Sequence, residues 1–228
     1  MPLFIDNTKN RIIDVVMCID LTAGSPIIDE VRRGAPTFCS RLADGFEEHS
    51  DFFTGGYDIR IRFVGYRDFS VDELPIVESP FFSPSTEEGM AEMMAFLDGL
   101  HAHGGGDLPE SGLEALAIAM RSDWRPYEQL ARRIIVLWTN SLTHPLGVGS
   151  DRENYPEQMP KSMEELRDLW LSEVGNKGAR LFVLAPEIDP IWSDIIFWPR
   201  VYTTDVPCGG SGDVDFDGLI DIITTLAR

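Results

Sequence analysis

The chain contains 228 residues, 43% of them apolar, which is enough for one α/β domain with a substantial core. Its 38 acidic and 19 basic residues give a formal net charge of −19, which disfavours nucleic acid and anionic membrane surfaces as partners, because both attract a positive surface. The three cysteines (Cys18, Cys39 and Cys208) have no paired spacing, so neither a disulfide framework nor a zinc ribbon is expected.

Nothing in the length requires a second domain, so we expect a single domain over residues 1–228, with residues 1–10 as an N-terminal extension. These first residues lack the basic stretch and the apolar core of a signal peptide. No window reaches the roughly 18 to 20 apolar residues of a membrane span. We therefore expect a cytoplasmic protein.

The first strong signal is a nearly unbroken apolar run that begins after Arg11 and ends at Asp20. It is rich in β-branched residues and too short to span a membrane, which is typical of a strand buried on both faces. In an α/β sheet, ligands bind just beyond the carboxyl ends of such strands. Here Asp20, Thr22 and Ser25 lie on one tight turn and offer three oxygen ligands to a hard cation.

Strands and helices alternate along the rest of the chain. Apolar spacing predicts helices over 27–49, 85–100, 109–120, 163–174, 188–198 and 216–226, and strands over 57–68, 75–82, 131–140, 181–185 and 201–206. This alternation predicts a doubly wound, Rossmann-like α/β fold with helices on both faces of a mostly parallel central sheet. We expect about six strands, one of them a short antiparallel edge strand.

Two local features refine the predicted helices. Pro36 lies inside the first helical pattern and predicts a kink or a break near Gly34–Ala35. Ser85, with Glu88 three positions later, matches a capping box at the start of the second helix.

Polar residues follow two more elements of the predicted sheet. Asp107 ends the glycine loop 104–106 immediately before a helix, and Asn140 ends the buried strand over 131–140. In a doubly wound sheet, these loops and the turn after Asp20 converge at one carboxyl edge.

The sequence resembles the von Willebrand factor type A (vWA) domain family in four motifs: IDLTAGS, GYRD, GGGDLPESGLEAL and WTNSLTHPLG. The resemblance covers nearly the whole chain from about Arg11, and it is closest to intracellular and bacterial stand-alone A-domains. It implies a vWA fold and a metal-ion-dependent adhesion site, whose first loop reads Asp-x-Ser/Thr-x-Ser. Asp20 and Thr22 fit this pattern.

The chain departs from the family pattern in each of the three loops. The fifth position of the first loop is Gly24, and the serine follows one place later as Ser25. The second loop offers Asp107 where the family commonly has threonine, and the third offers Asn140 where it commonly has aspartate. The resemblance therefore implies a variant site for Mg²⁺ or Ca²⁺. A site free of metal, in which the loop hydroxyls and Asp107 cap helices, is the alternative.

In this family a carboxylate from the partner completes the coordination of the ion. We therefore expect a protein-interaction or scaffold module, not an enzyme, that binds a protein partner presenting an acidic residue. Asp68 and His144 are expected at the rim of that site. The alternatives are a metal-assisted phosphohydrolase on a doubly wound fold and a metal-free vWA-like interaction protein.

A second acidic stretch, Asp213–Asp221, imitates the start of an EF-hand calcium loop. Its twelfth position is Thr224, which is not a bidentate acid. An acidic first turn of the last helix is the alternative interpretation.

Overall fold

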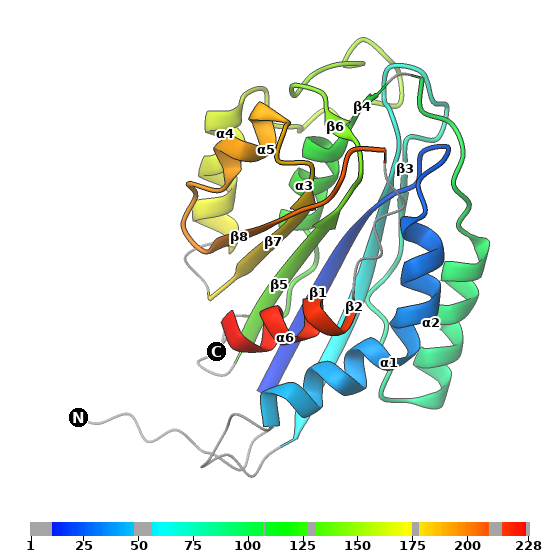
Figure 1. Ribbon diagram of the computed structural model, residues 1–228, viewed down its shortest axis with the longest axis vertical. Coiled ribbons are helices and arrows are strands. Elements are labelled where there is room, and N and C mark those ends of the chain that lie inside the picture. The colour runs from blue at the N-terminus through cyan, green and yellow to red at the C-terminus, as the bar shows by residue number, and fades with distance from the viewer. Residues whose placement is uncertain are drawn as a thin grey trace.

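The computed structural model describes residues 11–47, 56–106, 108–126, 131–174, 178–209 and 216–226. The predicted extension 1–10, Asp107 and the start of the EF-like stretch at Asp213 lie outside these ranges. Six strands form the central sheet in the order β3-β2-β1-β5-β7-β8 (Figure 1). Their bounds are β1 Arg11–Asp20, β2 Tyr57–Tyr66, β3 Ile76–Glu78, β5 Ala131–Trp138, β7 Arg180–Ala185 and β8 Val201–Asp205.

All neighbouring strands of this sheet run parallel, except that β3 is antiparallel to β2. The predicted mostly parallel sheet with one short antiparallel edge strand is therefore confirmed. A second, two-stranded sheet pairs β4 (Pro109–Glu110) with β6 (Leu142–Thr143) and was not expected. Strands of two residues are too short to produce a periodic pattern in the sequence.

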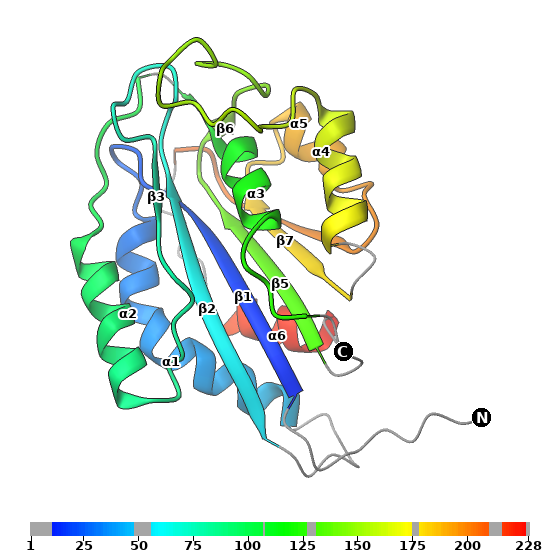
Figure 2. The ribbon, with the colours of Figure 1, turned by 180° about the vertical axis from the view of Figure 1, so that it is seen from behind.

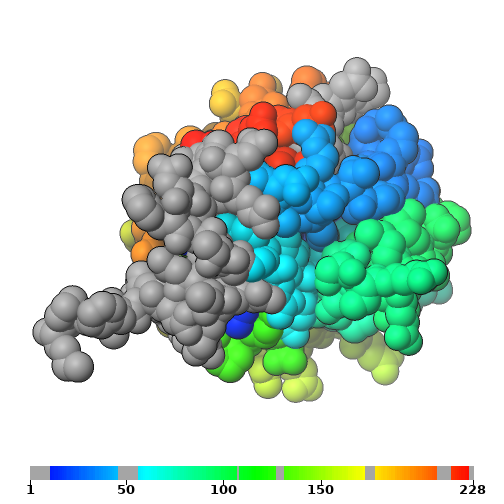
Figure 3. Space-filling model, turned by 90° about the horizontal axis from the view of Figure 1, so that it is seen from below, coloured from blue at the N-terminus to red at the C-terminus, as the bar shows by residue number. Residues whose placement is uncertain are grey.

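Helices cover both faces of the sheet (Figures 1 and 2). One face carries α1 (Ile27–Glu47), α2 (Glu87–Gly99) and α6 (Phe216–Leu226). The opposite face carries α3 (Gly112–Met120), α4 (Met163–Leu169), its π-helical continuation η1 (Trp170–Val174) and α5 (Pro190–Ile195). Seen from the end where β1 begins, α1 lies between α6 and α2 (Figure 3). No helix in the described ranges is both long and apolar enough to cross a membrane.

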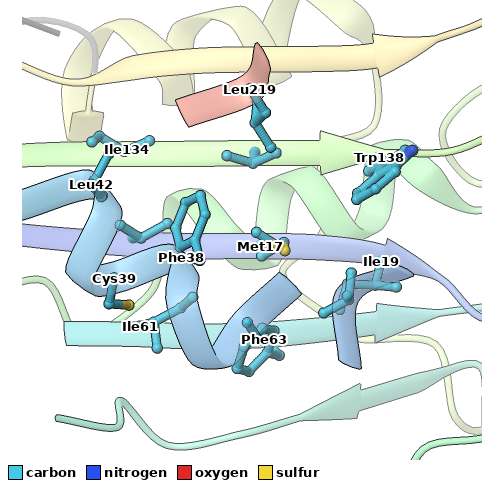
Figure 4. Packing of buried hydrophobic residues seen from close by; sticks show 14 of the residues in the cluster. Met17, Ile19, Phe38, Cys39, Leu42, Ile61, Phe63, Ile134, Trp138 and Leu219 are labelled. Carbon is cyan, nitrogen blue, oxygen red and sulfur yellow. The ribbon is translucent and has the colours of Figure 1, made fainter. Parts of the chain in front are cut away.

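The unbroken apolar character of β1 follows from its central place in this sandwich. Met17 and Ile19 pack under α1, whereas Val16 and Cys18 pack on the α3 side. Figure 4 shows Met17 of β1 and Phe38 of α1 in the same apolar cluster, to which neighbouring strands contribute further side chains. Because both faces of β1 are covered, no polar alternation is needed along it.

Pro36 lies within α1, which is assigned as one helix from Ile27 to Glu47. Figure 1 shows that α1 changes direction along its length, so the predicted kink is present and the predicted alternative of a break is not. Proline lacks an N–H and its ring crowds the preceding turn, which bends a helix without necessarily ending it.

The expected capping box at Ser85 is wrong, because the N-cap of α2 is Thr86. The hydroxyl of Thr86 accepts a hydrogen bond from the N–H of Gly89 at 3.0 Å. The cap therefore lies one residue later than the Ser85–Glu88 spacing suggests, and a glycine stands where the box needs an acid.

Replacing Thr86 by alanine is expected to lower the free energy of unfolding by about 1 kcal/mol, because the N–H of Gly89 loses its partner at the helix start. Ser85→Ala is the matched control and should change stability by less than about 0.5 kcal/mol. Urea denaturation followed by circular dichroism measures both. If Thr86→Ala and Ser85→Ala lower the free energy of unfolding equally, Ser85 contributes to the cap as much as Thr86 does.

Candidate site at the carboxyl edge of the sheet

The carboxylate of Asp20, at the end of β1, is completely buried and held by hydroxyl groups. Its Oδ1 accepts hydrogen bonds from the N–H of Thr22 at 2.9 Å and from the hydroxyl of Thr22 at 2.6 Å. Its Oδ2 accepts from the hydroxyl of Thr139, at the end of β5, at 2.7 Å. The structure thus joins the first and third sequence loops at one carboxylate.

The charge of Asp20 is not balanced by a basic side chain. Among the residues that the structure describes, no Lys or Arg forms an ion pair with it. A second acid, Glu110, is also buried, and Gly105 lies near both it and Thr22. Glu110 Oε1 lies close enough to Gly105 that a Cβ there would approach it to 2.7 Å, and the same Cβ would lie 3.1 Å from Thr22 Cβ. The two carboxylates therefore flank one small region.

Tyr66, at the end of β2, has a hydroxyl whose pKa is affected by burial and by these two acids. Its side chain is fully buried, and burial raises the pKa of its hydroxyl well above the ordinary value. The charges of Asp20 and Glu110 raise that pKa further, because they disfavour a phenolate nearby. Tyr66 is therefore a neutral hydroxyl at the floor of the site.

The remaining predicted ligands occupy different positions. Ser25 donates its hydroxyl hydrogen to the carbonyl oxygen of Asp20 at 3.1 Å and accepts weakly from the N–H of Ile27, so it also serves the start of α1. Asn140 is buried, and its backbone carbonyl oxygen accepts from the N–H of Gly209 at 2.8 Å. Asp107 lies outside the described residues. Thr139, which donates to Asp20, and Glu110, which lies near Gly105, were not among the predicted ligands.

The loops around Asp20 are tied to one another through their backbones. The N–H of Ala23 donates to the carbonyl of Gly104 at 3.0 Å, and the N–H of His103 donates to the carbonyl of Leu21 at 2.9 Å. Gly104 has a φ of 73°, and a Cβ there would lie 2.0 Å from a carboxylate oxygen of Asp72. The glycine loop therefore approaches the β2–β3 loop more closely than any side chain would permit.

Asp68 and His144, the predicted rim residues, lie next to each other. His144 Nε2 is 3.6 Å from Asp68 Oδ2, and the same carboxylate accepts hydrogen bonds from the N–H and the hydroxyl of Ser70 at 2.7 and 2.6 Å. Asp68 is completely buried. The structure thus brings the two residues together, with the Asp68 side chain fully buried and the His144 side chain 13% exposed.

A further buried acid, Glu114 on α3, fastens the long loop that follows β6. Its Oε1 accepts hydrogen bonds from the N–H of Gly147 at 3.1 Å and from the hydroxyl of Tyr155 at 2.9 Å. Burial raises the pKa of Glu114, and these two hydrogen bonds oppose that shift. No sequence motif singles out this residue, because it lies within an otherwise apolar helical pattern.

The chemistry of the donors at Asp20 suits a hard divalent cation. Carboxylate and hydroxyl oxygens are the ligands that Mg²⁺ and Ca²⁺ prefer, and Asp20 supplies a buried negative charge. Within the described residues, no three His, Cys, Asp or Glu side chains are grouped so that they could hold a metal ion. A cation here would therefore depend on one or two carboxylates together with neutral oxygens.

No protein-family model and no curated protein matches the sequence. Two crystal structures of the pilus adhesin SpaC from Lactobacillus rhamnosus GG are similar in structure. The first is 8% identical with a TM-score of 0.57 and covers 96% of this chain, and the second, an open conformation, is 7% identical with a TM-score of 0.52 and covers 95%. A von Willebrand factor type A protein from Catenulispora acidiphila is 10% identical over 94% of this chain, with a TM-score of 0.48.

These likenesses concern the fold. The chain spans 31% and 30% of the length of the two adhesin chains and 42% of the Catenulispora chain. The strand order and the adhesin similarity define a doubly wound α/β protein with its polar loops at the carboxyl edge of the sheet. More particularly, the chain has a vWA-like fold, as the sequence motifs predicted.

Proposed function

We propose that this chain is a vWA-type protein-interaction module that binds an acidic side chain of a partner through Mg²⁺ or Ca²⁺ at Asp20. The observation that carries this proposal is the buried carboxylate of Asp20, which accepts hydrogen bonds from hydroxyl and N–H groups and has no ion pair in the described part of the chain. A buried, unbalanced carboxylate is unfavourable by itself, and a cation offsets that penalty.

The residues that would hold the ion are Asp20, Thr22, Ser25, Asp107 and Asn140. Asp20 and Asp107 contribute charge, whereas Asn140 contributes a neutral amide oxygen where the family commonly has a carboxylate. Glu110, buried next to Thr22, is a further acid that this site offers. When bound, a divalent cation supplies the positive charge that attracts a carboxylate of the partner.

An interaction module agrees better with this geometry than a metal-assisted phosphohydrolase does. Both oxygens of Asp20 already accept hydrogen bonds from fixed hydroxyls, and its nearest side chains are threonines. A hydrolase needs a general base or a nucleophile with an available lone pair beside the ion. A metal-free interaction protein remains the alternative that the experiment below distinguishes.

Calorimetric titration with Mg²⁺, Mn²⁺ and Ca²⁺ tests the proposal. We expect the wild type to bind one ion and to gain thermal stability with increasing ion concentration, by about 2.7 kcal/mol at a hundred times the Kd. Asp20→Asn keeps the shape of the side chain but removes its charge, and it should bind no ion. Asp98→Asn, at an exposed acid on α2, is the matched control and should bind as the wild type does.

The partner's role is tested with the Mn²⁺-loaded protein and acetate as the carboxylate probe. Acetate should displace a metal-bound water and lower the proton relaxation enhancement of the wild type.

If millimolar ion produces neither heat nor a thermal shift in the titration, the chain is the metal-free interaction protein. If Asp20→Asn binds the ion as the wild type does, the ion binds at another site, for example at Asp213–Asp221. Turnover of a phosphoester that is lost in Asp20→Asn would favour the phosphohydrolase.

A further inference from the structure

Among the described residues, β8 forms one edge of the central sheet and is separated from β1 by β5 and β7 in the sheet order β1-β5-β7-β8 (Figure 1). β8 is the last strand in the sheet order and pairs in parallel with β7 alone. Such an edge presents unpaired backbone N–H and C=O groups that another extended chain can use.

The hydrogen bonds on either side of β8 fix which residues face outward. Leu181 N–H donates to the carbonyl of Arg200, and Val206 N–H donates to the carbonyl of Ala185. Even-numbered residues of this strand thus face β7, so the N–H and C=O of Thr203 face away from the sheet. Within the described residues, no backbone partner of Thr203 is present on that side.

An apolar cavity lies beside this edge, on the sheet face that carries α5. It has a volume of about 210 Å³. Thr203 pairs with Val183, so both side chains point to the same face and both line the cavity. The apolar walls are completed by Ala185, Pro186, Trp192, Ile196 and Phe197.

The walls of this cavity are unusually exposed for apolar side chains. Phe197 is 83% exposed and Ile196 is 45% exposed, and the nearby Ile188 is 78% exposed. Apolar side chains that gather around a concave site mark a binding surface more often than scattered ones do. The cavity holds several times the volume of one water molecule, which is about 30 Å³, so it accommodates a side chain.

Acidic residues surround the cavity. Glu187 lines it, and Asp205 at the end of β8 accepts a hydrogen bond from the N–H of Glu187 at 2.9 Å. Asp194 on α5 is exposed as well. No Lys or Arg is among the residues that line the cavity, and the whole chain carries a net charge of −19. A partner segment that places basic side chains here is favoured by its charge.

We propose that the outer edge of β8 binds an extended, basic segment of a partner protein as an added β-strand. The backbone of that segment pairs with Thr203, one of its apolar side chains enters the cavity, and its flanking Lys or Arg side chains meet Glu187 and Asp205. Backbone pairing provides affinity and the cavity provides selectivity, as in other cases of strand addition. This surface is separate from the Asp20 site and needs no metal ion.

Fluorescence anisotropy in EDTA with the labelled heptapeptide Ser-Lys-Ser-Leu-Ser-Lys-Ser tests the proposal on the full chain. In an extended strand, this lysine–leucine peptide places its two lysines and its leucine on the same face. We expect saturable binding to the wild type. Thr203→Pro removes the outward N–H without touching the ladder to β7 and should weaken binding by about tenfold, which is the loss of one hydrogen bond. Thr203→Val keeps that N–H and should bind within about threefold of the wild type.

Three further probes separate the components of the surface. Phe197→Ser removes a wall of the cavity and should weaken binding of the same peptide. Replacing the leucine of this peptide by serine, or both lysines by glutamate (the glutamate–leucine peptide), should weaken binding. Equal binding by Thr203→Pro, or by the glutamate–leucine peptide, would overturn the proposal.

Hydrogen exchange provides a readout that does not depend on variant folding. The amide of Thr203 in the wild type should exchange more slowly when the lysine–leucine peptide is bound, and unchanged exchange would overturn the proposal. Sedimentation without peptide tests another occupant. A dimer of the wild type that Thr203→Pro abolishes would assign this edge to a second copy of the chain instead.

Discussion

Replacing Asp14 by alanine is expected to lower the free energy of unfolding by about 3 kcal/mol, because the change leaves two partly buried guanidinium groups without their shared, buried carboxylate. Asp14 lies in the middle of β1 and is 1% exposed. Arg60 donates to its two oxygens at 3.0 and 2.8 Å, and Arg125 donates through its side chain at 2.7 Å and its backbone N–H at 2.9 Å. Each oxygen of this carboxylate therefore accepts two hydrogen bonds, all of them from Arg60 and Arg125.

The same cluster sets a pH dependence. Burial by itself raises the pKa of Asp14, but the hydrogen bonds and charges of Arg60 and Arg125 more than offset it, so the pKa is lowered from the ordinary value of 3.8. A carboxyl whose pKa is lowered on folding stabilises the folded state above its unfolded pKa. That contribution is lost as the pH falls through the lowered folded value, so the wild type should lose stability in acid more steeply than Asp14→Asn.

Urea denaturation at pH 7 and at several values below pH 4 measures both effects. Asp58→Asn is the matched control, since Asp58 also pairs with Arg125 at 2.7 Å but its side chain is 49% exposed. Exposed ion pairs contribute at most about 1 kcal/mol, so this control should be close to the wild type. If the Asp14 and Asp58 variants lose similar free energies of unfolding, burial does not govern the strength of this cluster.

Trp170→Ala should destabilise the protein by about 3–5 kcal/mol through loss of a large, fully buried side chain. Trp170 begins η1 and packs in the apolar cluster on the α3 face of the sheet. Its Nε1–H donates to the carbonyl of Pro199 at 2.9 Å. The side chain thereby joins the α4 region to the turn that leads into β8.

Trp170→Phe separates packing from hydrogen bonding, because it keeps an aromatic ring but leaves the carbonyl of Pro199 without its donor. It should lower the free energy of unfolding by about 1–3 kcal/mol. Phe197→Ala removes a ring that is 83% exposed and should change stability by less than about 0.5 kcal/mol. Urea denaturation by circular dichroism compares the three. A small effect of Trp170→Ala would mean that the surrounding side chains refill the space.

The fold could be predicted from the sequence because its strongest signals are collective. The run that ends at Asp20 is apolar on both faces only because helices cover both sides of β1. The alternation of Ile59 and Ile61 with charged residues likewise reflects a strand with one covered face over that stretch. The N-cap at Thr86 was misplaced since Ser85 and Thr86 are chemically equivalent, and the backbone conformation alone decides between them.

The candidate site was predictable only in part. Asp20 and Thr22 lie together in the sequence, and so their contact follows from local spacing. The contact of Asp20 with Thr139 and the approach of Glu110 depend on the register of β1 with β5 and on the course of the glycine loop. These are long-range properties of the folded chain, and no local pattern encodes them.

The position of β1 in the sheet has a consequence for how the chain assembles as it is synthesised. β1 emerges first, yet its two neighbours are β2 and β5, and Val15 pairs with Ile61 on one side and with Ile134 on the other. Until β5 has left the ribosome, one hydrogen-bonding side of the most apolar strand has no partner. Because such distant pairings form slowly and expose strand edges meanwhile, the nascent chain should need a chaperone most during this interval.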